Sequence, residues 1–236
     1  MLKINEKHLE TFGRIRDLFL SKTEIPKESK WQSLSDNDVW LNVVAQVMVV
    51  GGSKPFEKFK NNENLKNQIA FENLLQIADQ ELVKKTINHV LRVVGTRYAS
   101  RDLSKCAKSR ALAYNFNFLR KFDGGPKGFL KQISEIENEK QRIDYVKENL
   151  RYIQNKGARD FLMELGIVRN SIAIDSRIQT ILNKMGIEIP LNSLGDPALY
   201  EKIQTELLEK VCKPLNLSGI EFDRLLYQNY KEIMSS

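Results

Sequence analysis

Hydrophobic residues recur at helical spacing along nearly the whole chain, and no segment shows the strict alternation that is typical of a β-strand. Apolar faces of this kind predict helices at 8–20, 36–50, 156–165 and 176–185. Weaker patterns add helices at 55–60, 69–76, 79–94, 104–121, 126–134 and 138–150. We therefore expect an all-α protein.

Capping residues mark several of the helix starts. Ser35 and Asp38 precede the apolar run VVAQVMVV (43–50), which is also compatible with a strand. Asp196-Pro197 has the pattern of an N-cap followed by proline in the first turn, and Ser218 with Glu221 matches a capping box. By contrast, KFDGGPKGF (121–129) lacks the Gly-Lys-Ser/Thr ending of a phosphate-binding loop, so we interpret it as a connection.

Composition and charge narrow the function classes. The 236 residues are 42% hydrophobic and 28% charged, which is ordinary for a globular protein and enough for one large domain or two small lobes. No apolar run is long enough to span a membrane, and the start of the chain does not look like a signal peptide. The net charge of +7 favours nucleic acid as a partner, with a lysine-rich solvated surface as the alternative.

The cysteines and histidines do not indicate a metal site. Cys106 and Cys212 are far apart in sequence and fit reduced, partly buried thiols of a cytosolic protein. His8 and His89 have no partner at ligand spacing, so zinc chemistry is not expected.

The segment NKGARDFLMELG (155–166) carries the first candidate for chemistry. Its apolar face ends at Gly166, which makes Asn155 the expected N-cap and Lys156 the first helical residue. The positive end of the helix dipole, with partial desolvation, favours a neutral lysine amine, which is a nucleophile. The alternative is a surface lysine on an amphipathic helix.

The second candidate is Asp175, at the start of the next amphipathic helix and directly after the apolar run Ile172-Ala-Ile174. Aspartate is a preferred N-cap worth about 1 kcal/mol, and that role alone would explain it.

Taken together, KGARDFLMELG and the following IAIDSRI resemble the helix-hairpin-helix DNA glycosylases, and most closely the compact 8-oxoguanine DNA glycosylase/lyase branch. The shared pattern is Lys-x-Ala, then Phe-Leu, a glycine, and an apolar run ending in aspartate. Weaker similarities are Trp40 with its apolar helix and Arg97-Tyr98 before a basic helix. The resemblance implies two helical lobes flanking a cleft, with 1–40 and 165–236 as the terminal lobe and 41–164 as the central lobe ending in the hairpin and catalytic helix.

The resemblance also implies a mechanism and a partner. A damaged base is flipped out of double-stranded DNA, Lys156 attacks the deoxyribose C1′ to form a Schiff base, and β-elimination cleaves the strand. Asp175 stabilises the developing positive charge. No metal or organic cofactor is implied. The partner is duplex DNA with a damaged base or an abasic site, bound by a monomer in the cytoplasm, nucleoid or nucleus, wherever the DNA is.

Several positions depart from the family pattern. The hairpin normally reads Gly-x-Gly, but this chain has Tyr152 and Gln154 there, so Tyr152, Ile153, Gln154 and Asn155 are expected to contact DNA in another way or merely to cap the helix. Relatives often have histidine at the position of Arg177. We expect Arg177 either to clamp a phosphate or to be an exposed arginine in the first turn of its helix. The loop 49–54 lies where relatives have polar residues that fill the space left by the flipped base. Gly51 and Gly52 cannot fill much of that space.

Three interpretations therefore stay open: an 8-oxoguanine glycosylase/lyase, a glycosylase for another damaged base, and a non-catalytic helical DNA-binding module.

Lys105, Lys108 and Arg110 are expected to face phosphate or to form a solvated surface.

Overall fold

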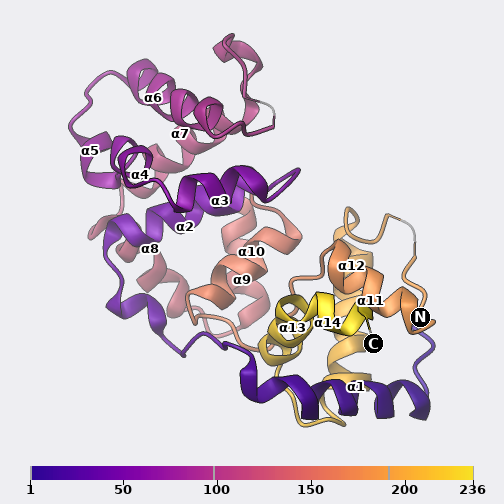
Figure 1. The fold of residues 1–236 in the computed structure, drawn as a ribbon. Helices are drawn as coiled ribbons and strands as arrows, with labels where there is room; N and C mark the ends of the chain where they lie inside the picture. The colour runs from indigo at the N-terminus through magenta and orange to yellow at the C-terminus, as the bar shows by residue number, and fades with distance from the viewer. Residues whose placement is uncertain (1, 98, 191, 236) are drawn as a thin grey trace. The chain divides into compact units, whose positions relative to one another are not determined.

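Helices form all the regular secondary structure within the described part of the chain, which confirms the all-α prediction. The computed structural model describes residues 2–97, 99–190 and 192–235 (Figure 1), so Tyr98 lies outside the described residues. The helices are α1 (Glu6–Phe19), α2 (Asp36–Met48), α3 (Lys54–Lys60), α4 (Glu63–Gln68), α5 (Phe71–Leu75), α6 (Gln80–Val93), α7 (Ala107–Leu119), α8 (Gly125–Ser134), α9 (Glu139–Asn149), α10 (Asn155–Glu164), α11 (Ser176–Lys184), α12 (Pro197–Leu207), α13 (Gly219–Gln228) and α14 (Tyr230–Ser235).

The chain divides into two compact units. The central unit is continuous and comprises 31–157, whereas the terminal unit combines 1–30 with 158–236. Both breaks come earlier in the chain than the lobe boundaries expected after residues 40 and 164. The second break falls inside α10, so Lys156 belongs to the central unit and most of α10 to the terminal unit.

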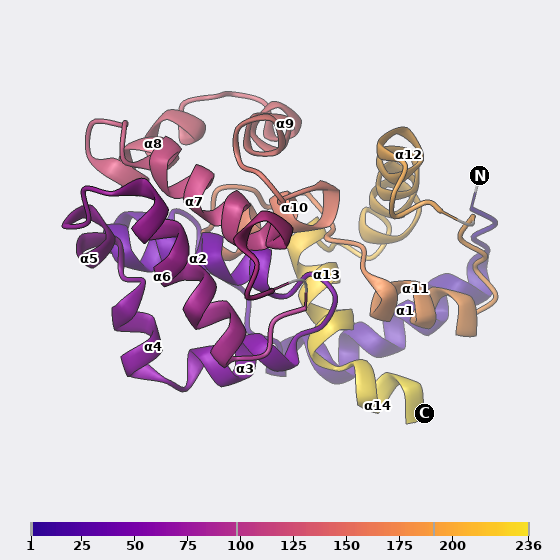
Figure 2. The same cartoon turned by 90° about the horizontal axis from the view of Figure 1, so that it is seen from above.

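The central unit is built around α2, which packs against α7 and α8 (Figures 1 and 2). α2 is a helix rather than a strand, and Val43, Val44 and Val47 on it are fully buried. Trp40, Phe71 and Phe116 pack edge to face or tilted against one another, with ring centroids 5.3 to 6.4 Å apart. The indole of Trp40 donates a hydrogen bond to the carbonyl of Ile69 (2.7 Å), which leaves no polar atom of this large side chain unpaired.

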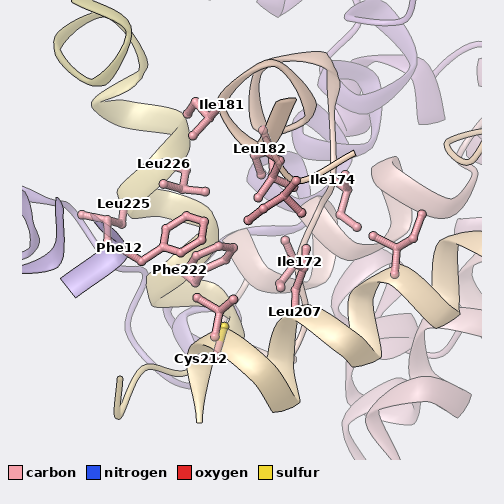
Figure 3. Packing of buried hydrophobic residues seen from close by; sticks show 14 of the residues in the cluster. Phe12, Ile172, Ile174, Ile181, Leu182, Leu207, Cys212, Phe222, Leu225 and Leu226 are labelled. Atoms are coloured by element: carbon pink, nitrogen blue, oxygen red, sulfur yellow. The ribbon is translucent and has the colours of Figure 1, made fainter. Parts of the chain in front are cut away.

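The terminal unit has its own apolar core, formed by α1 and α11 to α14 (Figure 3). The rings of Phe12 on α1 and Phe222 on α13 meet edge to face at 5.4 Å. Ile181 and Leu182 from α11 join the same cluster, so the helix that follows Asp175 is anchored by its apolar face. The core also holds Ile172 and Ile174, which lie on either side of Ala173 in the segment leading to Asp175.

The predicted helix starts agree with the structure at Ser35, Asp196 and Ser218. Ser35 and Ser218 each form a complete capping box, and Asp196 caps α12 with Pro197 in its first turn. The prediction for 121–129 is partly wrong, because α8 begins at Gly125 after a turn in which Gly124 (φ +77°) and Gly125 (φ +57°) are left-handed. Sequence patterning also missed the short α4.

No helix in the described part of the chain is both long and apolar enough to cross a membrane.

Candidate active site and nucleic-acid interface

The hairpin segment, residues 150–154, connects α9 to α10. At its second position, the backbone NH of Arg151 donates to Asn115 Oδ1 (2.7 Å), and Asn115 Nδ2 donates back to the Arg151 carbonyl (3.0 Å). Asn115 is fully buried on α7, so one buried side chain holds both main-chain polar groups of Arg151. The next residue, Tyr152, has φ +69°, a left-handed conformation that costs a non-glycine residue roughly 1–2 kcal/mol. The chain thus keeps a glycine-like backbone where the resemblance expects glycine.

The predicted DNA contacts in this segment differ in exposure. Gln154 is exposed and Tyr152 is half-buried, whereas Ile153 is 1% and Asn155 6% exposed. A contact from Ile153 to DNA would therefore come from its main chain. The structure corrects the expected cap as well, because Asn155 is the first residue of α10 and Lys156 the second.

Lys156 lies half-buried in the first turn of α10. The predicted apolar face of this helix is confirmed, with Ala158, Phe161, Leu162 and Leu165 all fully buried. Gly166 ends the helix with φ +69°, and an added Cβ there would lie 2.1 Å from the carbonyl oxygen of Lys27. The position of the Lys156 backbone is therefore set by a well-anchored helix.

Asp175 is the N-cap of α11, as predicted. Its Oδ1 accepts hydrogen bonds from the backbone NH groups of Arg177 (2.9 Å) and Ile178 (3.0 Å). Oδ2 of the same carboxylate accepts no hydrogen bond from the described residues. One carboxylate oxygen is thus committed to the helix, and the other is available to a positively charged group.

The segment before Asp175 is held by buried polar side chains that sequence reasoning missed. Gln204 Oε1 accepts from Arg159 Nε (2.7 Å), Ser171 Oγ (2.8 Å) and the NH of Ile172 (3.1 Å). Arg159 is fully buried and also pairs with Glu201. Its guanidinium lies 4.5 Å from the ring centroid of Tyr200.

Two further groups fix the same segment from other sides. The Tyr200 hydroxyl donates to the carbonyls of Ile172 (3.2 Å) and Ile174 (3.4 Å), and burial raises the pKa of this hydroxyl, which keeps it a donor. Asp223 Oδ1 accepts from the NH of Ala173 (2.7 Å). Each residue from 171 to 174 therefore makes at least one hydrogen bond to a buried side chain, and the backbone that presents Asp175 is strongly constrained.

Arg177 is exposed in the first turn of α11, and its guanidinium lies over two aromatic rings. The ring centroids of Tyr227 and Tyr230 are 4.7 Å and 5.8 Å away. Stacking restricts the side chain while Arg177 stays exposed, which suits a phosphate contact.

Both alternatives predicted for Lys108, a contact with phosphate and a position on a solvated surface, are wrong, because its side chain lies in the core. It is fully buried, and its Nζ donates to the carbonyls of Met48 (3.0 Å) and Val50 (2.6 Å) at the C-terminal end of α2. Burial lowers the pKa of Lys108 to about 8. Lys105 and Arg110 are exposed, so the structure leaves both of their alternatives open.

The described residues contain no group of three or more His, Cys, Asp or Glu side chains arranged to hold a metal ion. Cys106 and Cys212 are buried free thiols, and burial raises the pKa of Cys212 to about 12. Cys212 is therefore an inert core residue.

The chain has the fold of the 8-oxoguanine DNA glycosylases, which confirms the predicted resemblance at the level of structure. The 8-oxoguanine DNA glycosylase of Thermotoga maritima matches with a TM-score of 0.63 and 20% identity, over 94% of this chain and 93% of that one. The Methanocaldococcus jannaschii enzyme matches with a TM-score of 0.61 and 18% identity, over 94% of both chains.

A second structure from Methanocaldococcus jannaschii, an 8-oxoguanine glycosylase/lyase in complex with a 15mer DNA containing 8-oxoguanine, has a TM-score of 0.64 and 16% identity, over 95% of this chain and 98% of that one. No family model and no curated protein matches the sequence.

Proposed function

We propose that this protein is a DNA N-glycosylase and abasic-site lyase that excises 8-oxoguanine from duplex DNA through a Schiff base on Lys156. The observation that carries the proposal is the pair of helix starts. A lysine lies in the first turn of α10 after a hairpin segment, and an aspartate caps α11, on a fold shared with three 8-oxoguanine glycosylase structures.

In the proposed reaction the neutral Lys156 amine attacks C1′ of the damaged nucleotide. The N–C1′ bond forms as the glycosidic bond breaks, and the base leaves with the electron pair and takes up a proton. Opening of the sugar ring gives an imine between Lys156 and C1′. Loss of a C2′ proton then expels the 3′ phosphate, which cleaves the strand. Amine chemistry of this kind requires no metal or organic cofactor.

Asp175 is proposed to stabilise the positive charge that develops on the sugar as the base departs. The free Oδ2 supports this role, since Oδ1 is already bound by two backbone NH groups. A carboxylate held by its own cap and by the constrained segment 171–174 would not need to reorganise during the reaction. Its negative charge is therefore preorganised.

DNA contacts are proposed for the hairpin segment and for α11. Tyr152 and Gln154 offer side chains, Ile153 its main chain, and Arg177 a stacked guanidinium for phosphate. Asn155 is buried, so its contribution would be to hold the start of α10. Duplex DNA as the partner is supported by the Methanocaldococcus jannaschii complex, which contains DNA with 8-oxoguanine. We propose that one monomer acts on each lesion.

Borohydride trapping tests the proposal directly. Wild type, Lys156→Gln and Asp175→Asn would be incubated with duplexes that contain 8-oxoguanine or an abasic site, and the covalent protein–DNA adduct quantified. We expect an adduct with wild type on both duplexes, none with Lys156→Gln, and a strongly reduced yield on 8-oxoguanine with Asp175→Asn. Asparagine is also a good N-cap, so Asp175→Asn removes the charge without removing the cap.

The two alternatives give different outcomes. A glycosylase for another damaged base would be trapped on the abasic duplex but not on 8-oxoguanine. A non-catalytic DNA-binding module would bind both duplexes and form no adduct on either.

A further inference from the structure

A pocket of about 620 Å³ lies within the central unit, between α7 and the end of α9 with the hairpin segment. Its polar lining is formed by Arg110 and Tyr114 from α7, by Lys147 and Glu148 from α9, and by Arg151, Tyr152 and Gln154 from the hairpin segment. Of these residues, the sequence pattern had singled out Arg110, Tyr152 and Gln154. The pocket opens beside the backbone of the hairpin segment, so it adjoins the surface proposed to contact DNA.

Arg151 is held through both its main chain and its side chain. Its backbone NH and carbonyl are both bound by the buried side chain of Asn115. Its guanidinium lies 4.2 Å from the ring centroid of Tyr114, the preceding residue on α7. Two successive residues of one helix thus fix the main chain and the side chain of Arg151, which lowers the entropy lost when it binds a ligand.

The charges in the pocket favour an anion. Arg110, Lys147 and Arg151 carry positive charge, and Glu148 is the one carboxylate among the lining residues. Lys147 also pairs with Asp144 (3.0 Å) and Arg110 donates to the carbonyl of Ser104, so each holds part of its charge elsewhere. Arg151 has no ion pair with a described residue, and its planar fork matches the oxygens of a phosphate.

We propose that this pocket binds a phosphodiester group of the DNA backbone, with Arg151 as the clamp, and so extends the DNA footprint beyond the hairpin segment. The proposal rests on the function proposed above, since it takes DNA as the ligand. A backbone phosphate is favoured because the pocket is continuous with the hairpin segment through Tyr152, so a strand bound at the hairpin could place a neighbouring phosphate in it.

The test is the salt dependence of binding to a duplex that contains an uncleavable abasic-site analogue, measured by fluorescence anisotropy. We expect Arg151→Gln to weaken binding about tenfold and to reduce the slope of log Kd against log salt by about one. Tyr114→Leu keeps every charge and is expected to weaken binding about threefold with little change in slope, because Arg151 loses its support.

Arg120→Gln is the matched control. Arg120 follows α7 directly, is exposed, and lies 5.9 Å from the ring centroid of Phe116, so it is also a stacked arginine but does not line the pocket. We expect it to change Kd less than twofold. Equal effects of Arg151→Gln and Arg120→Gln on Kd and slope would overturn the proposal. So would binding of inorganic phosphate that Arg151→Gln abolishes while the same variant binds the duplex as tightly as wild type, because the pocket would then be a site for a free anion and not for DNA.

Failure of this proposal can be separated from failure of the proposed function. A wild-type borohydride adduct together with equal slopes for the two arginine variants would overturn the proposed phosphate pocket and still support the proposed glycosylase function. A reduced slope for Arg151→Gln without any wild-type adduct would support the pocket in a DNA-binding protein that performs no Schiff-base chemistry.

Discussion

Lys108 and Lys156 are each the second residue of a helix, α7 and α10 respectively, but the surroundings of their side chains differ. Lys108 is fully buried and donates to two carbonyls at the C-terminal end of α2, where a cation is favoured by the helix dipole. Lys156 is half-buried in the first turn of α10, where the dipole disfavours a cation. For Lys108 the two carbonyls at the end of α2 offset the unfavourable dipole of its own helix, whereas Lys156 is the proposed nucleophile.

The comparison shows that a perturbed pKa alone does not identify a nucleophile. Burial lowers the pKa of Lys108 to about 8, so this amine is easily deprotonated. It is nevertheless enclosed, and its Nζ donates to two main-chain carbonyls, which leaves no route to a sugar carbon. Access to substrate therefore has to be judged together with charge state when a catalytic lysine is chosen.

The largest expected effect separates the two lysines by function. Lys156→Gln is expected to reduce the borohydride adduct at least about 1,000-fold, since no amine remains to form the imine, and to change the free energy of unfolding by less than about 1 kcal/mol. Lys108→Met should retain trapping under conditions where it is folded. An adduct that survives in Lys156→Gln and disappears in Lys108→Met would reverse the assignment.

A second prediction concerns Gln204, which supports the Asp175 segment as Lys108 supports the end of α2. Gln204→Leu leaves three buried donors without their acceptor, and we expect the free energy of unfolding to fall by about 3 kcal/mol. Urea denaturation followed by circular dichroism measures this change. Lys202→Leu, at an exposed position of the same helix, is the control, with an expected change within about 0.5 kcal/mol. Similar losses in both variants would mean that the buried network contributes little.

Lys108→Met is expected to destabilise the protein by about 1–3 kcal/mol, because the carbonyls of Met48 and Val50 lose their shared donor inside the core. Methionine has nearly the same length and flexibility, so the apolar part of the side chain is preserved. The midpoint of urea denaturation reports the difference. A variant as stable as wild type would show that relief from burying a charge offsets the lost hydrogen bonds.

The last prediction is a pH dependence of stability, which is small over any one pH unit. The pKa of Lys108 is about 8 in the folded protein and near its ordinary value of 10.5 after unfolding, so between these values the unfolded chain binds more protons. The contribution of Lys108 to the free energy of unfolding therefore rises with pH in this window, by at most roughly 1.4 kcal/mol per pH unit. The contribution of Lys108 is isolated when the urea midpoints of wild type and Lys108→Met are compared between about pH 8 and pH 10.5. Parallel curves for the two proteins would contradict the assignment.

The local parts of this structure could be predicted from the sequence. The caps at Ser35, Asp175, Asp196 and Ser218, and the buried faces of α10 and α11, depend on spacings of a few residues. Helix α4 was missed because ENLKNQ has a single apolar residue and is stabilised by its neighbours rather than by its own pattern.

The long-range polar contacts could not be predicted in the same way. Gln204 and Ser171 are far apart in the sequence, and nothing in their immediate surroundings pairs them. Lys108 and Asn115 did leave a signal, since both share the helical face of Leu112, Phe116 and Leu119. Because lysine is rarely fully buried, the sequence favours a Lys108 that faces phosphate or solvent over one in the core.

The route of the chain through the two units sets an order for folding. Residues 31–157 form the central unit as one continuous stretch of chain, whereas the terminal unit combines 1–30 with 158–236. During synthesis the central unit can fold as soon as it leaves the ribosome, while α1 waits for α13 to bury Phe12 against Phe222. Until then α1 exposes its apolar face, so the nascent protein is most prone to aggregation when its central unit is already native.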